Sequence, residues 1–265
     1  MGSEVPKTRI QELGRRALIF IVSLIVLLIL WQIISSQSNP LIFSSPLTVL
    51  TALVNLYEKH NLVGAILSML WLLLLGFGLS ILTGIPIGLT MGRVKIVDDI
   101  IDPYMTAFYV LPRVALIPLF IIWFGFGTLT SVLFVYTFSF FPIILIVSQG
   151  VKNTDKLFIE VARIGCASEG QIFRKVILPS SAPYVFAALR LGLSIALIGV
   201  VIAQLELVVT GVGELLLNAG EFFRTDQILA LLLILAIVGY VLSEIFRVIE
   251  ARVTRGYRLN TFAGM

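Results

Sequence analysis

Six long apolar runs with few charged residues limit what this chain can fold into. A helix needs about 20 apolar residues to cross the hydrocarbon core of a bilayer. The candidate spans lie at roughly residues 17–35, 62–91, 103–124, 128–149, 184–208 and 227–249. They are continuously rich in Leu and Ile and lack the alternation of apolar and polar residues found in membrane β-strands. The sequence therefore predicts an all-α integral membrane protein.

The first run follows basic residues, as a cleaved signal peptide would, but we expect it to remain as a span. Its apolar stretch, residues 17–34, is longer than the apolar core of a signal peptide, and residues 35–38 lack a small-residue cleavage pattern. We therefore expect a cytoplasmic segment at 1–16, a membrane domain at 17–249 and a cytoplasmic tail at 250–265.

The basic residues predict the orientation in the plasma (inner) membrane, because Lys and Arg beside the spans are retained in the cytoplasm. They gather before the first span and after the second, fourth and sixth, at Lys7, Arg9, Arg15, Arg16, Arg93, Lys95, Lys152, Lys156, Arg163, Arg174, Lys175, Arg247, Arg252, Arg255 and Arg258. Both termini and segment 150–183 are thus expected in the cytoplasm. Contact with anionic membrane lipid explains the net charge of +4, so no nucleic-acid partner is expected.

Two rare residue types argue against catalysis. The chain has one cysteine, Cys166, and one histidine, His60, which are too few for a cysteine-cluster metal site or a Ser-His-Asp triad. It also has no phosphate-binding loop and no Gly-Lys pair, so it cannot hold ATP in that way. We expect no enzyme activity, no catalytic residue, and no metal or cofactor bound by this chain.

Segment 160–179 is charged and lies between apolar runs, as expected of a part that contacts another protein. Ser168 and Gln171 have the spacing of a capping box, which predicts a helix from about Glu169. Pro179 is expected to end this helix. Its apolar face comprises Ile172, Phe173, Val176 and Ile177. This face could dock a partner, or it could pack as a lid on the protein's own helices.

The same segment resembles the EAA loop of binding-protein-dependent ABC importer permeases, whose pattern is Glu-Ala-Ala, a glycine, then Ile-x-Leu-Pro. The matches in register are Glu160, Ala162, Leu178 and Pro179, with Val161 and Val176 as apolar replacements. The family's glycine position is Cys166 here, and Gly165 lies one residue earlier. The turn between the two short helices is therefore expected to differ locally.

Further likeness narrows the resemblance to the nitrate/sulfonate/taurine branch of these permeases. It comes from residues 111–119, 122–125, 179–192, 211–213 and 226–230. The resemblance implies a six-helix type I ABC importer permease bundle with a cytoplasmic EAA coupling helix.

The resemblance also implies a division of labour among several chains. Two copies of this permease would form the path for a small solute, two ABC ATP-binding subunits would hold ATP and Mg, and an external solute-binding protein would deliver the solute. The implied coupling residues are Glu160, Ala162, Arg163, Gly165, Cys166, Ser168, Phe173, Leu178 and Pro179. The alternative for Glu160 is that it only caps or solvates a surface helix.

Polar side chains within the spans are candidates for the solute path, because charge is costly there. Arg113 would suit an anion, although it could instead reach the interface or pair with a carboxylate. Related permeases commonly carry a glutamate where this chain has Gln204, and Glu206 lies about 200° further round the helix. Arg190 and Glu244 also qualify by position, and snorkelling or pairing within the bundle is the simpler interpretation of Arg190.

The resemblance favours a small anion of the sulfonate, taurine or nitrate type as the solute. A vitamin precursor, such as a pyrimidine of thiamine salvage, is the alternative within the same class. A stand-alone secondary transporter and an intramembrane enzyme are disfavoured, because the sequence shows no internal repeat, no ionisable relay and no cluster of acids and bases.

Two further patterns concern packing and the external face. Gly84, Gly88 and Gly92 share one helical face and predict close helix packing within the subunit, although Pro86 among them makes a kink an alternative. Segment 36–61 is expected to be an external loop with a short interfacial helix that could contact the solute-binding protein.

Overall fold

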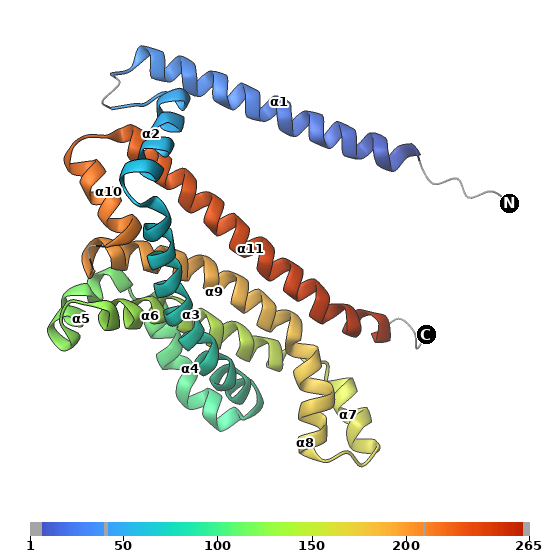
Figure 1. Cartoon of the computed structure of the whole chain (residues 1–265). Helices are drawn as coiled ribbons and strands as arrows, with labels where there is room; N and C mark the ends of the chain where they lie inside the picture. Colours follow the sequence, from blue (N-terminus) through green and yellow to red (C-terminus); the bar gives the residue numbers. More distant parts are fainter. Residues whose placement is uncertain (1–6, 40–41, 209, 262–265) are drawn as a thin grey trace. The chain divides into compact units, whose positions relative to one another are not determined.

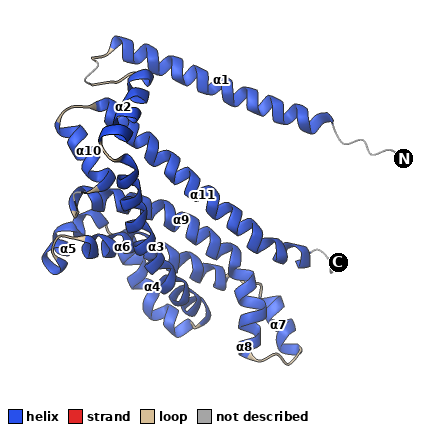
Figure 2. Ribbon diagram, in the orientation of Figure 1, coloured by secondary structure: helices blue, strands red, loops and turns tan. Residues whose placement is uncertain are grey.

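The protein's computed structural model describes residues 7–39, 42–208 and 210–261, and within them every regular element is a helix (Figures 1 and 2). The elements are α1 (Lys7–Gln37), α2 (Pro46–Lys59), α3 (Leu62–Arg93), α4 (Lys95–Val110), η1 (Arg113–Leu116), α5 (Ile117–Phe124), α6 (Thr128–Lys152), α7 (Lys156–Ile164), α8 (Glu169–Ile172), η2 (Phe173–Ile177), α9 (Leu178–Glu206), α10 (Gly211–Glu221) and α11 (Thr225–Thr261). The predicted all-α fold is confirmed.

Five helices of the described chain are long and apolar enough to cross a membrane. These candidate spans are Leu18–Gln37, Leu62–Arg93, Thr128–Lys152, Glu169–Glu206 and Thr225–Arg252. A sixth arises only if α4 and the η1–α5 stretch form one broken span, because the two parts meet at a bend of 94°.

The span expected at 103–124 is therefore not one straight helix, and it is present only if the bent pair crosses the membrane as one broken span. Leu111 has an extended backbone, with ψ of 133°, because the ring of the following Pro112 disfavours the helical conformation of the residue before it. The helix ends at Val110, and the chain restarts through the 3-10 turn of Arg113–Leu116.

Other predicted boundaries also move. Helix α11 continues to Thr261, so the described part of the expected 250–265 tail is helical. Within segment 36–61 the expected short helix is α2, where the Ser45 hydroxyl accepts a hydrogen bond from the backbone N–H of Thr48 and caps the first turn.

The structure divides into two compact units. One unit comprises residues 1–61 and 216–233, and the other comprises residues 62–215 and 234–265. In the second unit, α3, α6 and α9 pack against one another and form the core. Its buried members on α6 include Phe134, Val135, Ile143, Ile144 and Val147.

Small residues let α3 approach α6 closely. A Cβ atom built on Gly88 would lie 2.8 Å from the Ile144 carbonyl oxygen and 2.9 Å from Val147 Cβ, so the position has no room for a side chain. Gly84 and Gly92 face Ile143 and Val151 of the same helix. The predicted packing role of the glycine stripe is confirmed, and it acts within the subunit.

Buried hydroxyl groups add a polar link to this contact. Ser139 Oγ on α6 lies 2.8 Å from Ser80 Oγ on α3, and Ser80 Oγ also lies 3.0 Å from the Tyr136 carbonyl oxygen. Both serines are fully buried, so a slip of one helix along the other would leave polar groups unsatisfied. The link therefore helps to set the register of α3 on α6.

A substitution on the α3 glycine stripe tests this packing. We expect Gly88→Val to force α3 and α6 apart and to lower stability by about 1–3 kcal/mol, the usual range for overpacking. The measurement is the thermal unfolding midpoint of the purified protein in detergent. Gly78→Val is the matched control, because a Cβ at Gly78 on the same helix meets nothing within 4 Å. Equal midpoints for the two variants would contradict the packing role.

Candidate functional site: the segment of residues 155–179

Helix α7 and the turn after it are built from local caps. The Asp155 carboxylate accepts a hydrogen bond from the backbone N–H of Leu157 at 2.9 Å and starts the helix. At its other end, Ala167 N donates to Ala162 O, and Cys166 N donates to Arg163 O. These two bonds are those of a Schellman motif, in which the residue at the Cys166 position adopts a left-handed conformation.

Cys166 has a φ of +55°, whereas Gly165 has an ordinary φ of −74°. The position where the family pattern has glycine is thus the one whose backbone favours glycine. The turn therefore differs from the family pattern in that a residue with a side chain, Cys166, occupies a left-handed position, which strains the backbone there.

The predicted capping box is present at the start of α8. Ser168 Oγ accepts from Gln171 N at 3.4 Å, and Gln171 Oε1 accepts from Ser168 N at 2.8 Å. The helix begins at Glu169, as predicted from the spacing.

The expectation that Pro179 ends this helix is wrong. Helix α8 passes into the π-helical turn η2, where Leu178 N donates to Phe173 O, and α9 then continues from Leu178 to Glu206. Proline has no N–H to donate and would clash with the carbonyl group four residues earlier in a regular α-helix. A wider π turn just before Pro179 relieves that conflict, so α8, η2 and α9 form one continuous helical stretch, Glu169–Glu206, which changes direction between α8 and α9 (Figure 1).

The apolar face of α8 and η2 packs on the protein itself. Ile172 and Ile177 are buried against Val151 at the end of α6. The cluster is completed by partly buried neighbours: Leu89, Ile159, Ala162, Ala167, Phe173 and Val176. This face therefore packs as a lid on the protein's own helices, which was one of the two alternatives, and is not a free docking face in this structure.

The exposed apolar surface of the segment lies on α7 instead. The stripe of Leu157, Val161 and Ile164 is 60%, 58% and 83% exposed, respectively. Glu160 and Arg163, two of the predicted coupling residues, are also exposed on this helix. Sequence reasoning missed the stripe, although the spacing i, i+4, i+7 of Leu157, Val161 and Ile164 is the signal that could have revealed it.

Charged contacts tie the short helices together. Arg163 Nη2 lies 3.2 Å from Glu169 Oε1, which links α7 to α8. Arg93 at the end of α3 donates to the Glu169 carbonyl oxygen at 3.1 Å, and its guanidinium lies 4.8 Å from the centre of the Phe173 ring. These groups are exposed, so each pair contributes at most about 1 kcal/mol, and their main effect is on orientation.

Gln204 does not line an open path in this structure. Its side chain is fully buried, its amide nitrogen donates to Ser68 Oγ at 3.0 Å, and its amide oxygen accepts from Gly213 N at 3.4 Å. Gln204 therefore joins α9 to α3 and to the start of α10, and its role in the solute path stays a prediction. Glu206, the last residue of α9, is exposed.

Arg113 lies at the break between α4 and α5, half-buried among aromatic rings. Its guanidinium carbon lies 5.7, 5.4 and 5.9 Å from the ring centres of Tyr109, Phe138 and Phe141. Nη2 donates to the Tyr109 carbonyl oxygen at 3.3 Å, and the buried Nε has no hydrogen-bond partner. No ion pair within the described residues includes Arg113, so it is not paired with a carboxylate there.

The other two charged candidates are paired. Arg190 contacts Glu250, and Glu244 contacts Arg247 at 2.6 Å. Among the described residues, no hydrogen bond or ion pair joins Arg113 to Gln204 or Glu206. The three predicted path residues therefore do not form one polar cluster in this structure.

The strained turn at Cys166 gives a direct test of the segment's local structure. We expect Cys166→Gly to raise stability by about 1 kcal/mol, because glycine removes the left-handed strain. Gly165→Ala is the control, because its φ is negative and a Cβ there meets only ordinary contacts. The measurement is the rate of proteolysis within residues 155–179 of the purified protein. A Cys166→Gly variant cleaved as fast as the parent would contradict the strain.

The chain matches known transport proteins over most of its length. Residues 84–258 match the family described as binding-protein-dependent transport system inner membrane component. The taurine transport system permease protein TauC of Escherichia coli (strain K12) is 31% identical over 249 residues, which cover 91% of this chain and 90% of that protein.

Two further relatives extend the comparison. SsuC of Bacillus subtilis (strain 168), whose name assigns it to aliphatic sulfonates transport, is 30% identical over 87% of this chain and 84% of its own length. The formylaminopyrimidine transport permease protein ThiX of Halalkalibacterium halodurans is 26% identical over 81% of this chain and 86% of its own length. With its apolar helices, this chain is a multi-pass inner membrane protein and a transporter component rather than an enzyme. It belongs to the family of binding-protein-dependent transport system inner membrane components, as an ABC importer permease of the taurine/sulfonate branch.

Proposed function

We propose that the α7 stripe, defined as Leu157, Val161 and Ile164, docks the ATP-binding subunit of the importer. The observation that carries this proposal is the exposure of all three side chains next to a face of α8 that is already buried. Exposed apolar patches on a soluble surface usually mark an interaction site. The charged neighbours Glu160 and Arg163 would form the polar rim of the contact.

The same geometry supports a role in coupling. Helix α7 is tied to α8 by the Arg163–Glu169 pair, and α8 runs through η2 into α9. Ile172 of α8 and Ile177 of η2 pack on Val151 at the end of α6. A movement imposed on α7 by closure of the ATP-binding subunits would therefore reach two helices of the core together.

The remaining partners follow from the family. Two ATP-binding subunits would bind ATP and Mg, a second copy of this permease would complete the path, and a solute-binding protein would dock on the external face. Both termini and the α7–α8 pair would lie in the cytoplasm, in line with the basic residues around them.

For the solute we propose a small anion of the sulfonate, taurine or nitrate type. The names of two relatives point to taurine and aliphatic sulfonates. In this chain, Arg113 is a cation at a helix break without a carboxylate partner among the described residues, which suits an anion in the path. A thiamine-salvage pyrimidine is the alternative, supported by the likeness to ThiX.

A charge placed in the α7 stripe tests the docking proposal. We expect Ile164→Asp to weaken copurification with the ATP-binding subunit by about tenfold or more, because a desolvated carboxylate would face an apolar contact. Ile96→Asp is the matched control, since Ile96 is 71% exposed on α4 and lies outside the stripe. Equal retention of the subunit by both variants would count against docking at α7.

The solute proposal has a separate test at Arg113. We expect Arg113→Gln to lower uptake of a radiolabelled sulfonate by about tenfold or more in the reconstituted importer, because the substitution removes the cation. Arg113→Lys keeps the charge and is expected to retain most uptake. ATP hydrolysis without solute-binding protein monitors assembly. Unchanged sulfonate uptake by Arg113→Gln would argue against an anion contact at this residue.

A further inference from the structure

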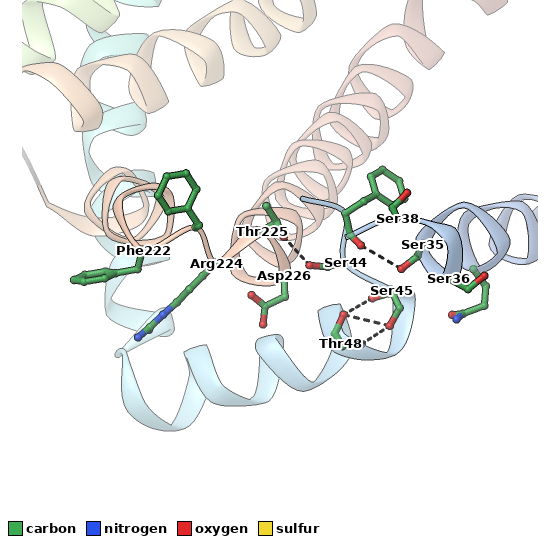
Figure 3. A pocket seen from close by; sticks show the side chains of 13 residues that line it. Ser35, Ser36, Ser38, Ser44, Ser45, Thr48, Phe222, Arg224, Thr225 and Asp226 are labelled. Atoms are coloured by element: carbon green, nitrogen blue, oxygen red, sulfur yellow. Dashed lines mark hydrogen bonds between the residues drawn. The ribbon is translucent and has the colours of Figure 1, made fainter. Parts of the chain in front are cut away.

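A cavity lined by both polar and aromatic side chains lies at the end of α1 that leads to α2, far in sequence from residues 155–179. Its volume is about 510 Å³, within the usual range of about 300–1,000 Å³ for small-molecule pockets. All of its lining residues belong to the unit of residues 1–61 and 216–233. Figure 3 shows the cavity, with serine side chains from residues 35–45 on one side and residues 222–226 on the other.

Two opposite charges line this cavity without neutralising each other. Arg224 and Asp226 are both lining residues, yet no ion pair or side-chain hydrogen bond within the described residues involves either charged group. The Arg224 guanidinium instead lies 5.4 Å from the centre of the Phe222 ring. A site with a separated cation and anion is complementary to a molecule that carries both charges.

The backbone around Arg224 is held in place. Phe223 has a left-handed φ of +52°, and the N–H of Arg224 donates to the Ala219 carbonyl oxygen at 2.8 Å. The Arg224 carbonyl oxygen accepts from the N–H groups of Gln227 and Ile228, which start α11. The guanidinium thus extends from a fixed turn, and its five N–H donors suit an oxyanion such as a sulfonate or phosphate.

The serine hydroxyls opposite present acceptors more than donors. Ser36 Oγ and Ser38 Oγ donate to carbonyl oxygens of α1 at 2.8 Å, and Ser35 Oγ donates to the Phe43 carbonyl oxygen at 3.3 Å. Because their protons are used in this way, their lone pairs face outward as acceptors. An ammonium group has three donors and no acceptor, so it would be received by these oxygens together with the Asp226 carboxylate.

We propose that this cavity binds a small zwitterion in which a tetrahedral oxyanion and an ammonium group are joined by a short carbon chain. The oxyanion would contact Arg224, and the ammonium group would contact Asp226 and the serine oxygens. Two sources share this chemistry: a free aminoalkanesulfonate such as taurine, and the phosphoethanolamine head group of a lipid. Binding of a free aminoalkanesulfonate rests on the proposed function, whereas the proposal that the cavity binds a zwitterion does not.

Binding to the full-length permease alone separates this proposal from the importer function, since no ATPase or uptake is measured. The protein is placed in nanodiscs of phosphatidylcholine and phosphatidylglycerol and titrated with taurine, phosphoethanolamine and ethanesulfonate, which lacks the ammonium group. A second preparation contains phosphatidylethanolamine, and lipid that remains bound after delipidation is measured by native mass spectrometry. Arg224→Gln and Asp226→Asn are compared with Lys59→Gln and Glu58→Gln, which change exposed charges in the same unit outside the cavity.

We expect a zwitterion to bind about tenfold or more tightly than ethanesulfonate, and both cavity variants to lose that preference while the controls keep it. Binding of taurine would identify a free solute as the source, and retention of phosphatidylethanolamine alone would identify a lipid head group. The proposal is overturned if neither zwitterion is preferred over its singly charged analogue, or if the control variants lose binding to the same extent.

Discussion

The burial of Ile172 and Ile177 against Val151 is the contact on which the arrangement of residues 155–179 depends. It holds the short helices after α6 to the end of that helix. Because α6 is locked to α3 at Gly84, Gly88 and Gly92, the segment rests on the most tightly packed part of its unit. A lever needs this kind of support, since a loosely attached helix would absorb a movement rather than transmit it.

The same burial decides which surface is free. Most of the apolar face of α8 and η2 is used in this contact, with Phe173 and Val176 partly buried, so this face offers little apolar surface to a partner. Helix α7 keeps its apolar stripe exposed, and the Schellman turn at Cys166 sets the angle between the two helices. The segment thus divides into an anchoring helix and a presenting helix, joined by the Arg163–Glu169 pair.

Local signals predicted local structure well. The capping box of Ser168 and Gln171 is satisfied within one helix turn, so its spacing was enough. The glycine stripe of α3 predicted close packing from its spacing, but not that α6 is the helix it packs on. The partners of tertiary contacts could not be predicted from a single sequence. Nothing in the apolar pattern of residues 172–177 distinguishes burial on the protein itself from burial on a partner. The prediction that Pro179 ends the helix was wrong because a π turn accommodates a proline that would break a regular α-helix. The hydrogen bonds of Gln204 to Ser68 and Gly213 could not be predicted either, because both partners are distant in sequence.

Docking at the α7 stripe would place α7 and the turn after it against the ATP-binding subunit, and the single cysteine of the chain allows a direct measurement. Cys166 is exposed at the end of α7, so a maleimide should label it readily in the purified permease. We expect assembly with the ATP-binding subunits to slow this labelling by about tenfold or more, because Cys166 would lie beside a buried contact. An unchanged labelling rate in the assembled complex would contradict docking at the α7 stripe.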